Sequence, residues 1–411
     1  MGKLVAFQIH FDRQHAVYSA GDLITGYVQV DLQDTKFLRG IYMHFVGRAM
    51  VNWTEIESRG KSKVTIPYMA GECYFDQNIQ IFGKEPSEDN DDHQIPLEAG
   101  EHRFPFQFQL PARVLPCSFE GTLGYSRFFA RAVIDRPWKF DHVTKRAFTI
   151  SGVTVDLNKI PSGMSPVYAE DEKIVCCLCC ATGPISVSAH TDKKCYVPGE
   201  VVYISANLEN KSRRSVCTLE AELIQSVNYG ARREGVGAPG FRTTSHVVKA
   251  IRSEGCGSYS RATWVQKPLV IPPVPATGLE GCSFIDIKYY IKFTADVATT
   301  PFDVDLMLEI TVGTEPLEGS FFGRSMDNQN ETAIADIHID LGKSVEDLHT
   351  YEQCAHGAHE IRDEEDNEYV YGGLGFTPLY NFYKTPTSTP MPPRHQYLDV
   401  VTSSPDKSTS V

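Results

Sequence analysis

The chain has 411 residues and a formal net charge of −13, and 42% of its residues are hydrophobic. A single hydrophobic core stops growing near about 250–300 residues, so we expect two or three folded units, and this apolar content excludes a wholly disordered protein. The acidic balance argues against broad nucleic-acid binding. No apolar run approaches the roughly 18–20 residues of a membrane-spanning helix, and the first residues show no secretory signal. The eleven cysteines, an odd number, therefore predict free thiols in a reducing compartment.

Short alternating runs, rich in β-branched and aromatic side chains, follow one another through the first 317 residues. Residues 104–110, for example, alternate strictly between apolar and other side chains. Further runs occupy residues 23–32, 128–134, 201–208, 284–293 and 304–312. Glycine and proline separate the runs at turn-like intervals, and no long helical stripe interrupts them. The pattern predicts an all-β protein built of β-sandwiches.

The sequence also contains a weak internal repeat. Tyr-Ser-Ala-Gly-Asp at residues 18–22 is matched by Tyr-Val-Pro-Gly-Glu at residues 196–200. Three more pairs of segments match in the same order: residues 110–111 with 271–272, 120–121 with 280–281, and 127–131 with 288–292. Two copies at this spacing indicate a domain duplication. In both copies the glycine suits a turn with positive φ, and the acid after it can accept hydrogen bonds from nearby backbone N–H groups.

We therefore place the first sandwich at residues 1–155 and the second at residues 182–316. Residues 156–181, which contain a cysteine cluster, are expected to link them. Beyond residue 317 the composition changes, and residues 318–411 hold 6 basic and 16 acidic side chains. Such a segment cannot bury enough apolar area to offset the entropy of ordering the chain. We therefore expect residues 317–411 to be a largely disordered acidic tail.

Several segments resemble the α-arrestins, the arrestin domain-containing family. They occur in the family's order, at residues 16–22, 38–49, 104–111, 115–121, 183–186, 196–200 and 207–212. The resemblance implies two tandem arrestin-type, immunoglobulin-like β-sandwiches. It also implies a cytoplasmic adaptor, recruited to the plasma membrane or endosomes, that connects cytoplasmic segments of transmembrane cargo to HECT-type ubiquitin ligases and to endocytic and endosomal sorting.

No catalysis, cofactor or metal is expected, because the sequence lacks the serine-hydrolase elbow, the Walker motif and the zinc-protease motif. Two other interpretations stay open. One is a retromer-like trafficking scaffold without a ligase-binding motif, and the other is a thioredoxin-linked redox regulator.

The family's ligase-binding motif, Pro-Pro-x-Tyr, has only an incomplete counterpart in the tail. Thr377 stands where the first proline is expected, and Pro378 and Tyr380 follow it. A polyproline II ridge with a tyrosine suits the aromatic groove of a WW domain, so Pro378 and Tyr380 are a candidate WW ligand in an accessible tail. Residues 392–395 are a second candidate, with histidine in place of tyrosine. The alternative is a solvated tail with scattered prolines and tyrosines.

Two sets of cysteines are candidate reactive sites. Cys176, Cys177, Cys179 and Cys180 form a dense cluster before the second sandwich. Thiols this close suit one tetrahedral zinc ion poorly, so acylation or redox pairing is considered, and the alternative is a half-buried strand in which cysteine acts as a small apolar residue. Cys256, in a Gly-rich loop, is a further redox candidate whose alternative is an ordinary free thiol.

Two other polar sets have weaker functional readings. In the tail, Cys354, His356 and His359 lie close together, and a solvated tail explains them more simply than a loose metal site. A basic set on the first sandwich could contact anionic lipid, and the alternative is charges that alternate toward solvent. That set comprises Arg127, Arg131, Arg136, Lys139, Lys145 and Arg146.

Overall fold

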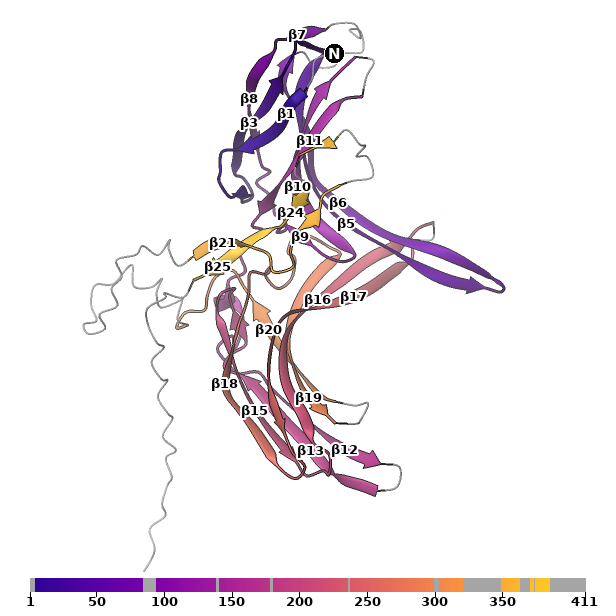
Figure 1. Cartoon of the computed structure of the whole chain (residues 1–411), viewed down its shortest axis with the longest axis vertical. Coiled ribbons are helices and arrows are strands. Elements are labelled where there is room, and N and C mark those ends of the chain that lie inside the picture. The colour runs from indigo at the N-terminus through magenta and orange to yellow at the C-terminus, as the bar shows by residue number, and fades with distance from the viewer. Residues whose placement is uncertain are drawn as a thin grey trace, which may run out of the picture.

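The computed structural model describes residues 4–83, 94–137, 140–177, 180–235, 237–298, 303–320, 349–362, 370–372 and 374–384, with Arg59, residues 175–177, residues 180–182 and His349 described by their backbone alone. Its regular structure is all β-strand apart from one 3₁₀ turn, η1 (Leu157–Lys159). Two β-sandwiches follow one another along the long axis of the molecule (Figure 1). The predicted all-β fold with two sandwiches is confirmed. No helix in the described residues is long and apolar enough to span a membrane.

The first sandwich packs a three-stranded sheet against a larger one. The smaller sheet has the order β1 (Leu4–Phe11), β3 (Leu23–Leu32) and β8 (Gly100–Gln109). The larger sheet uses β6 (Ser62–Gly83), β5 (Gly40–Arg59), β10 (Gly124–Asp135), β11 (His142–Ile150), β2 (Val17–Tyr18) and β9 (Phe119–Glu120). A short pair, β4 (Lys36–Leu38) and β7 (Ile95–Leu97), lies apart from both sheets. The aromatic-rich core between the sheets includes Phe45, Phe128 and Phe148.

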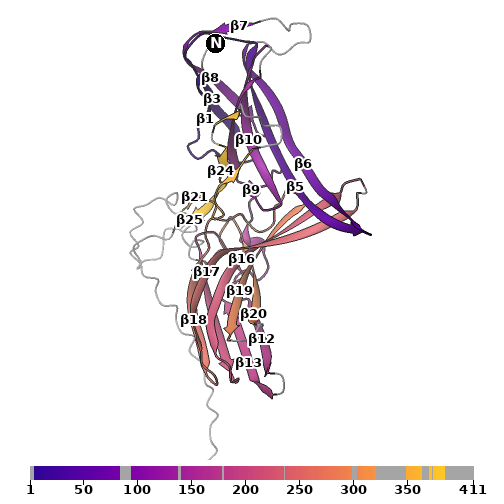
Figure 2. The ribbon, with the colours of Figure 1, turned by 45° about the vertical axis from the view of Figure 1, so that its right-hand side comes forward.

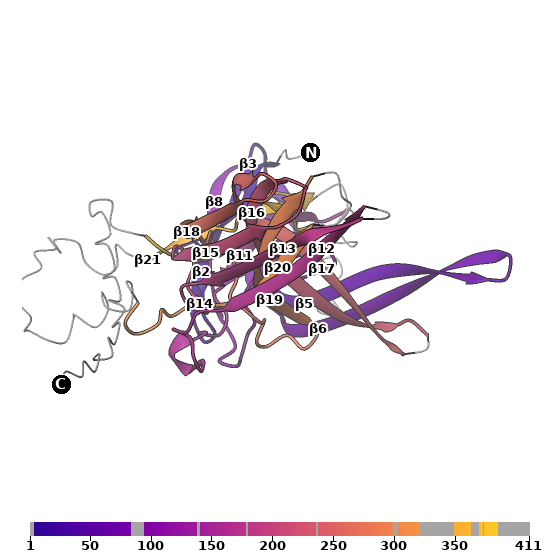
Figure 3. The same cartoon turned by 90° about the horizontal axis from the view of Figure 1, so that it is seen from below.

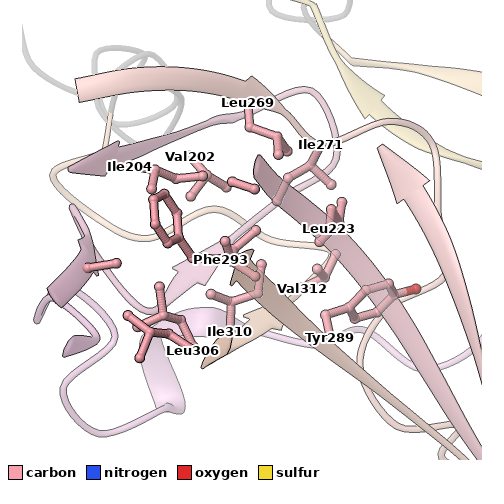
Figure 4. Close-up of a cluster of buried hydrophobic side chains, with 14 of the residues drawn as sticks. Val202, Ile204, Leu223, Leu269, Ile271, Tyr289, Phe293, Leu306, Ile310 and Val312 are labelled. Atoms are coloured by element: carbon pink, nitrogen blue, oxygen red, sulfur yellow. The ribbon is translucent and has the colours of Figure 1, made fainter. Parts of the chain in front are cut away.

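The second sandwich repeats this arrangement. One sheet has the order β12 (Tyr168–Cys177), β13 (Cys180–Thr191), β15 (Val201–Asn210) and β18 (Arg261–Val270). The facing sheet uses β14 (Cys195–Tyr196), β20 (Val304–Val312), β19 (Ile285–Val297), β16 (Val216–Arg233) and β17 (Pro239–Cys256). Their inner faces alternate with outer polar residues, so Ile204, Phe293 and Leu306 meet in the core (Figure 4).

One sheet crosses from the first sandwich into the second. The end of β16 pairs with β6, Arg232 opposite Met69 and Arg233 opposite Tyr68, which makes the two large sheets continuous. The β5–β6 and β16–β17 hairpins project together from one side of the molecule (Figure 2). Ion pairs from Arg233 to Glu57 (3.0 Å) and from Arg242 to Glu55 (3.7 Å) tie the hairpins to each other. The two sandwiches are therefore joined by backbone as well as by side chains.

The repeated turn has the conformation that its glycine predicted. Gly21 and Gly199 have φ angles of 81° and 95°. Asp22 and Glu200 each accept a hydrogen bond, at 3.0 Å, from the backbone N–H three residues earlier. The tyrosine of each copy is buried, and its strand, β2 or β14, pairs in parallel with the last strand of its sandwich. The duplication is thus present in the structure as well as in the sequence.

The linker is shorter than the predicted residues 156–181. Asp156 and η1 do connect the sandwiches, but residues 168–177 form β12, which pairs antiparallel with β13. Three members of the cysteine cluster, Cys176, Cys177 and Cys180, consequently lie at the end of a β-hairpin of the second sandwich.

The two copies of the turn differ in the burial of their ion pair, which predicts different energetic roles. Lys193 and Glu200 are 6% and 8% exposed, whereas Arg13 and Asp22 are 51% and 29% exposed. Lys193→Ala would leave a buried carboxylate without its cation and should destabilise the protein by about 3–5 kcal/mol. Arg13→Ala should cost no more than about 1 kcal/mol. Urea unfolding of both variants measures the difference, and equal losses would contradict this assignment.

Candidate functional site: a C-terminal strap at the domain seam

Within the tail that was predicted to be largely disordered, residues 317–411, the structure describes short strands that the sequence did not predict. We call residues 349–362, 370–372 and 374–384 the strap. Its strands pair within it, β21 (His349–Gln353) with β25 (Leu379–Tyr383) and β22 (His359–Glu360) with β24 (Gly375–Phe376). The fifth strand, β23 (Val370–Tyr371), pairs in parallel with β11. The β21–β25 pair lies beside the junction of the sandwiches, on the side away from the projecting hairpins, whereas β23 lies along the first sandwich (Figures 1 and 3).

The strap is hydrogen-bonded to the first sandwich. The Tyr380 hydroxyl donates to the carbonyl of Ser118 at 2.8 Å. The backbone N–H of Leu379 donates to the Thr149 hydroxyl at 3.2 Å. The β23–β11 pairing adds a backbone contact further along the same sandwich.

The same segment is bonded equally to the second sandwich. The N–H of Tyr383 donates to the carbonyl of Pro198 at 3.0 Å, inside the repeated turn, and its hydroxyl donates to the carbonyl of Thr314 at 2.8 Å. The N–H of Ala355 donates to the carbonyl of Pro273 at 3.0 Å. Because the start of β25 is bonded to the first sandwich and its last residue to the second, the strap bridges the seam between them.

The candidate WW ligand is therefore not exposed, and its predicted accessibility is wrong. Tyr380 is 7% exposed and Pro378 is buried. The Pro378 carbonyl accepts a hydrogen bond from the N–H of Cys354 at 2.9 Å. Both Pro378 and Tyr380 are therefore hydrogen-bonded within the folded protein. Burial raises the pKa of Tyr380 well above its ordinary value. The alternative candidate at residues 392–395 lies outside the described residues.

Two cysteines that the sequence did not single out for this seam lie beside Tyr380. Cys117 comes from the first sandwich and lines the small cavity, about 40 Å³, that remains under Tyr380. Burial raises the pKa of Cys117 to about 12 and that of Cys354 to about 11, which keeps both thiols protonated and unreactive near neutral pH. No group of three or more histidine, cysteine or acidic residues in the described chain is arranged to hold a metal ion.

The basic set that was predicted to face anionic lipid is not exposed at its central members, so the prediction is wrong for them. Arg127 is buried in a bidentate ion pair with Glu120, with N–O distances of 2.7 and 2.8 Å. Lys145 is also buried, with its ammonium 5.0 Å from the centre of the Phe129 ring. Arg146 donates to a carbonyl of β1 at 2.8 Å. Of the remaining set, Arg131 and Arg136 are half-buried and Lys139 lies outside the described residues.

The other cysteine candidates stay predictions. The backbones of Cys176 and Cys177 pair with Ala181 and Cys180 at the end of the β12–β13 hairpin, and Cys179 lies outside the described residues. Cys256 ends β17, where it is half-buried against the core of the second sandwich. The structure brings neither set near the strap's Tyr380.

Histidines line one contact between the strap and the body. The rings of His356 in the strap and His246 on β17 lie 4.6 Å apart, edge to face. The Nε2 atoms of His356 and His359 are buried without a hydrogen-bond partner. Burial, followed by the nearby His246 and His359, lowers the pKa of His356 to about 4. The docked strap therefore favours neutral His356.

The tandem sandwiches with a shared sheet define an arrestin-type fold, and comparison with known proteins agrees. The family models described as "Arrestin (or S-antigen), N-terminal domain" and "Arrestin (or S-antigen), C-terminal domain" match residues 7–158 and 181–317. Arrestin domain-containing protein 4 of Homo sapiens is 31% identical over 332 residues, covering 80% of this chain and 74% of that protein. Arrestin domain-containing protein 1 of Mus musculus is 29% identical over 319 residues, covering 77% and 67%. The chain belongs to the arrestin domain-containing family, the α-arrestins.

Glycine at the repeated turn offers a matched test of strap docking. A Cβ on Gly199 would lie 2.0 Å from the carbonyl oxygen of Tyr383, whereas one on Gly21 would meet only Ala112, at 3.6 Å. Both glycines have positive φ, so alanine strains both turns, but only Gly199→Ala should expel the strap. We expect Cys354, buried in the docked strap, to react with a thiol reagent at least tenfold faster in Gly199→Ala.

Gly21→Ala is the control for that experiment, because it carries the same backbone strain without touching the strap. Peptide mapping by mass spectrometry identifies the labelled cysteine. Equal Cys354 labelling in the two variants would show that the strap does not depend on its contact with the turn.

Acid should loosen the strap through His356. A free histidine titrates near pH 6.5, and docking lowers the pKa of His356 to about 4. The contribution of neutral His356 to the stability of the docked strap is consequently complete above about pH 6.5. It is lost as the pH falls from there toward about 4. We expect Cys354 labelling by a dipyridyl disulfide, which reacts with thiols in acid, to rise several-fold between pH 7.5 and 5. In His356→Gln the labelling of Cys354 should depend much less on pH. If the variant shows the same pH dependence as the wild-type protein, groups other than His356 control the docking.

Proposed function

We propose that this chain is a non-catalytic adaptor that links membrane-protein cargo to a ubiquitin ligase and to endocytic or endosomal sorting. Its membership of the arrestin domain-containing family supports the adaptor role, and two sandwiches held in one orientation offer an extended surface for partners. The chain then acts by proximity, because it brings a ligase and its substrate together while the ligase carries out the chemistry.

The burial of Tyr380 supports a particular control of this adaptor. Residues 377–380 are the described segment closest to a WW ligand, and in the docked strap both Pro378 and Tyr380 are buried. A WW domain needs the proline ridge and the tyrosine ring free. Ligase binding through this segment therefore requires release of the strap. The apparent affinity of the chain for a WW domain falls in proportion to the fraction of molecules in which the strap is released.

Binding of the whole chain to a panel of WW domains tests the proposal. Wild-type protein should bind weakly, and Gly199→Ala should bind at least tenfold more tightly because its strap is displaced. Adding Tyr380→Ala to Gly199→Ala should abolish the gain, and Gly21→Ala should behave as wild type. If the released strap binds no WW domain, this segment is not the ligase contact.

A retromer-like scaffold without a ligase contact is the second candidate function. Two observations favour it: Thr377 replaces the first proline of the motif, and Tyr380 already has a structural partner in the Ser118 carbonyl. Failure of every WW domain to bind the released strap would support this candidate over the ligase adaptor. Recruitment to the plasma membrane or endosomes is common to both proposals, and the redox alternative would have to act through Cys256 or the cysteine hairpin.

A further inference from the structure

A groove of about 490 Å³ opens at the junction of the two sandwiches, separate from the strap. Its walls come from β16, from β17 and from the loop that leads into β19, residues 277–284. The same loop also borders the seam cavity under Tyr380, so it forms a common wall between the groove and that cavity. Ligand sites form preferentially at such domain junctions, and this volume is within the usual range for them.

The groove presents an aromatic ring that the fold leaves uncovered. Phe241 on β17 is 71% exposed. It lies beside Gly230 on β16, where a Cβ would come 3.2 Å from the ring, so the glycine makes room for the ring against the strand. Phe284 and Cys282 also line the groove, and each packs against the cores of both sandwiches. The apolar floor is therefore rigid, whereas Phe241 is available to a partner.

The charge of the groove has one sign. Glu280 and Asp286 line it and are exposed, and no lysine or arginine is among its lining residues. Glu72 adds a third carboxylate at the rim, because it accepts the hydroxyl and the N–H of Ser283. An apolar floor with a carboxylate rim is complementary to an apolar side chain flanked by cations.

We propose that this groove binds an extended segment of another protein in which an aromatic or aliphatic residue is flanked by lysine or arginine. The apolar residue packs on Phe241 and Phe284, and the flanking cations face Glu280 and Asp286. The inference rests on the proposed function for the source of the segment. Cytoplasmic loops next to membrane spans are rich in lysine and arginine, so the groove would select this part of a membrane protein.

Fluorescence anisotropy with the full chain tests the proposal. The probe is a labelled nine-residue peptide with a central Phe-Leu pair and two lysines on each side. Two control peptides replace the lysines with glutamate or the Phe-Leu pair with serine. We expect saturable binding of the probe, and at least tenfold weaker binding of each control peptide.

Variants of the groove then locate the site. Phe241→Ser and the double variant Glu280→Lys/Asp286→Lys should each lower the affinity for the probe peptide at least tenfold. Val247→Ser is the matched control, because Val247 is also exposed on β17, at 46%, but does not line the groove. Circular dichroism melting of each variant excludes unfolding as the cause.

Three results of these peptide-binding experiments would overturn the proposal. They are no saturable binding, equal binding of the lysine and glutamate peptides, and groove variants that bind like Val247→Ser. Concentration-dependent self-association that Phe241→Ser abolishes would assign the groove to a second copy of this chain and would also overturn it. WW-domain binding is a separate readout, so failure of the ligase proposal leaves the peptide result intact.

Discussion

A tyrosine hydroxyl is costly to bury without an acceptor, and Tyr380 finds one across the boundary between the strap and the first sandwich. Leaving such a hydroxyl unpaired costs about 1–3 kcal/mol, a large fraction of the net stability of a domain. The Ser118 carbonyl meets this need only when the strap lies in one register. The neighbouring backbone N–H groups of Leu379 and Tyr383 donate to the first and the second sandwich from the same strand.

The seam between the sandwiches is held on two sides. On one side the pairing of β16 with β6 continues the large sheet from one sandwich to the other, and the paired hairpins reinforce it. On the other side the strap is bonded to both sandwiches. Each connection includes a backbone pairing of two residues, β16 with β6 and β23 with β11, but the shared sheet is part of both sandwiches, whereas the strap is a separate segment. Any regulated movement should therefore involve the strap rather than the shared sheet.

Much of the fold could be predicted from the sequence, because each strand carries its own alternation and each turn its own glycine. Gly21 and Gly199 show this most clearly, since the repeated Tyr-x-x-Gly-acid pattern predicted a turn with positive φ and both glycines adopt it. The predicted linker was too long because residues 168–175, which form most of β12, are rich in charged side chains and carry no strong strand signal. The basic set was misjudged because spacing does not reveal a partner such as Glu120, which pairs with Arg127 from another strand.

The strap was missed for a different reason. Its average composition is acidic, which is typical of disorder, but Phe376, Tyr380 and Tyr383 lie within eight residues and are all buried. That local aromatic density was the available signal, and averaging over the whole tail concealed it. The acceptors for its bonds, the carbonyls of Ser118, Pro198 and Thr314, are backbone groups of distant segments and have no side-chain signature. Sequence reasoning named Tyr380 correctly as unusual and assigned it to solvent instead of the seam.

Hydrogen–deuterium exchange of the full chain at neutral pH tests the central claim, that the strap is docked and hides Tyr380. The amides of Cys354, Ala355, Leu379 and Tyr383 donate to defined acceptors. The account predicts that peptides covering residues 351–357 and 376–384 exchange much more slowly than the same peptides in isolation, and that Gly199→Ala removes this protection while Gly21→Ala does not. Exchange of both segments at the rate of an unstructured chain in the wild-type protein would contradict it.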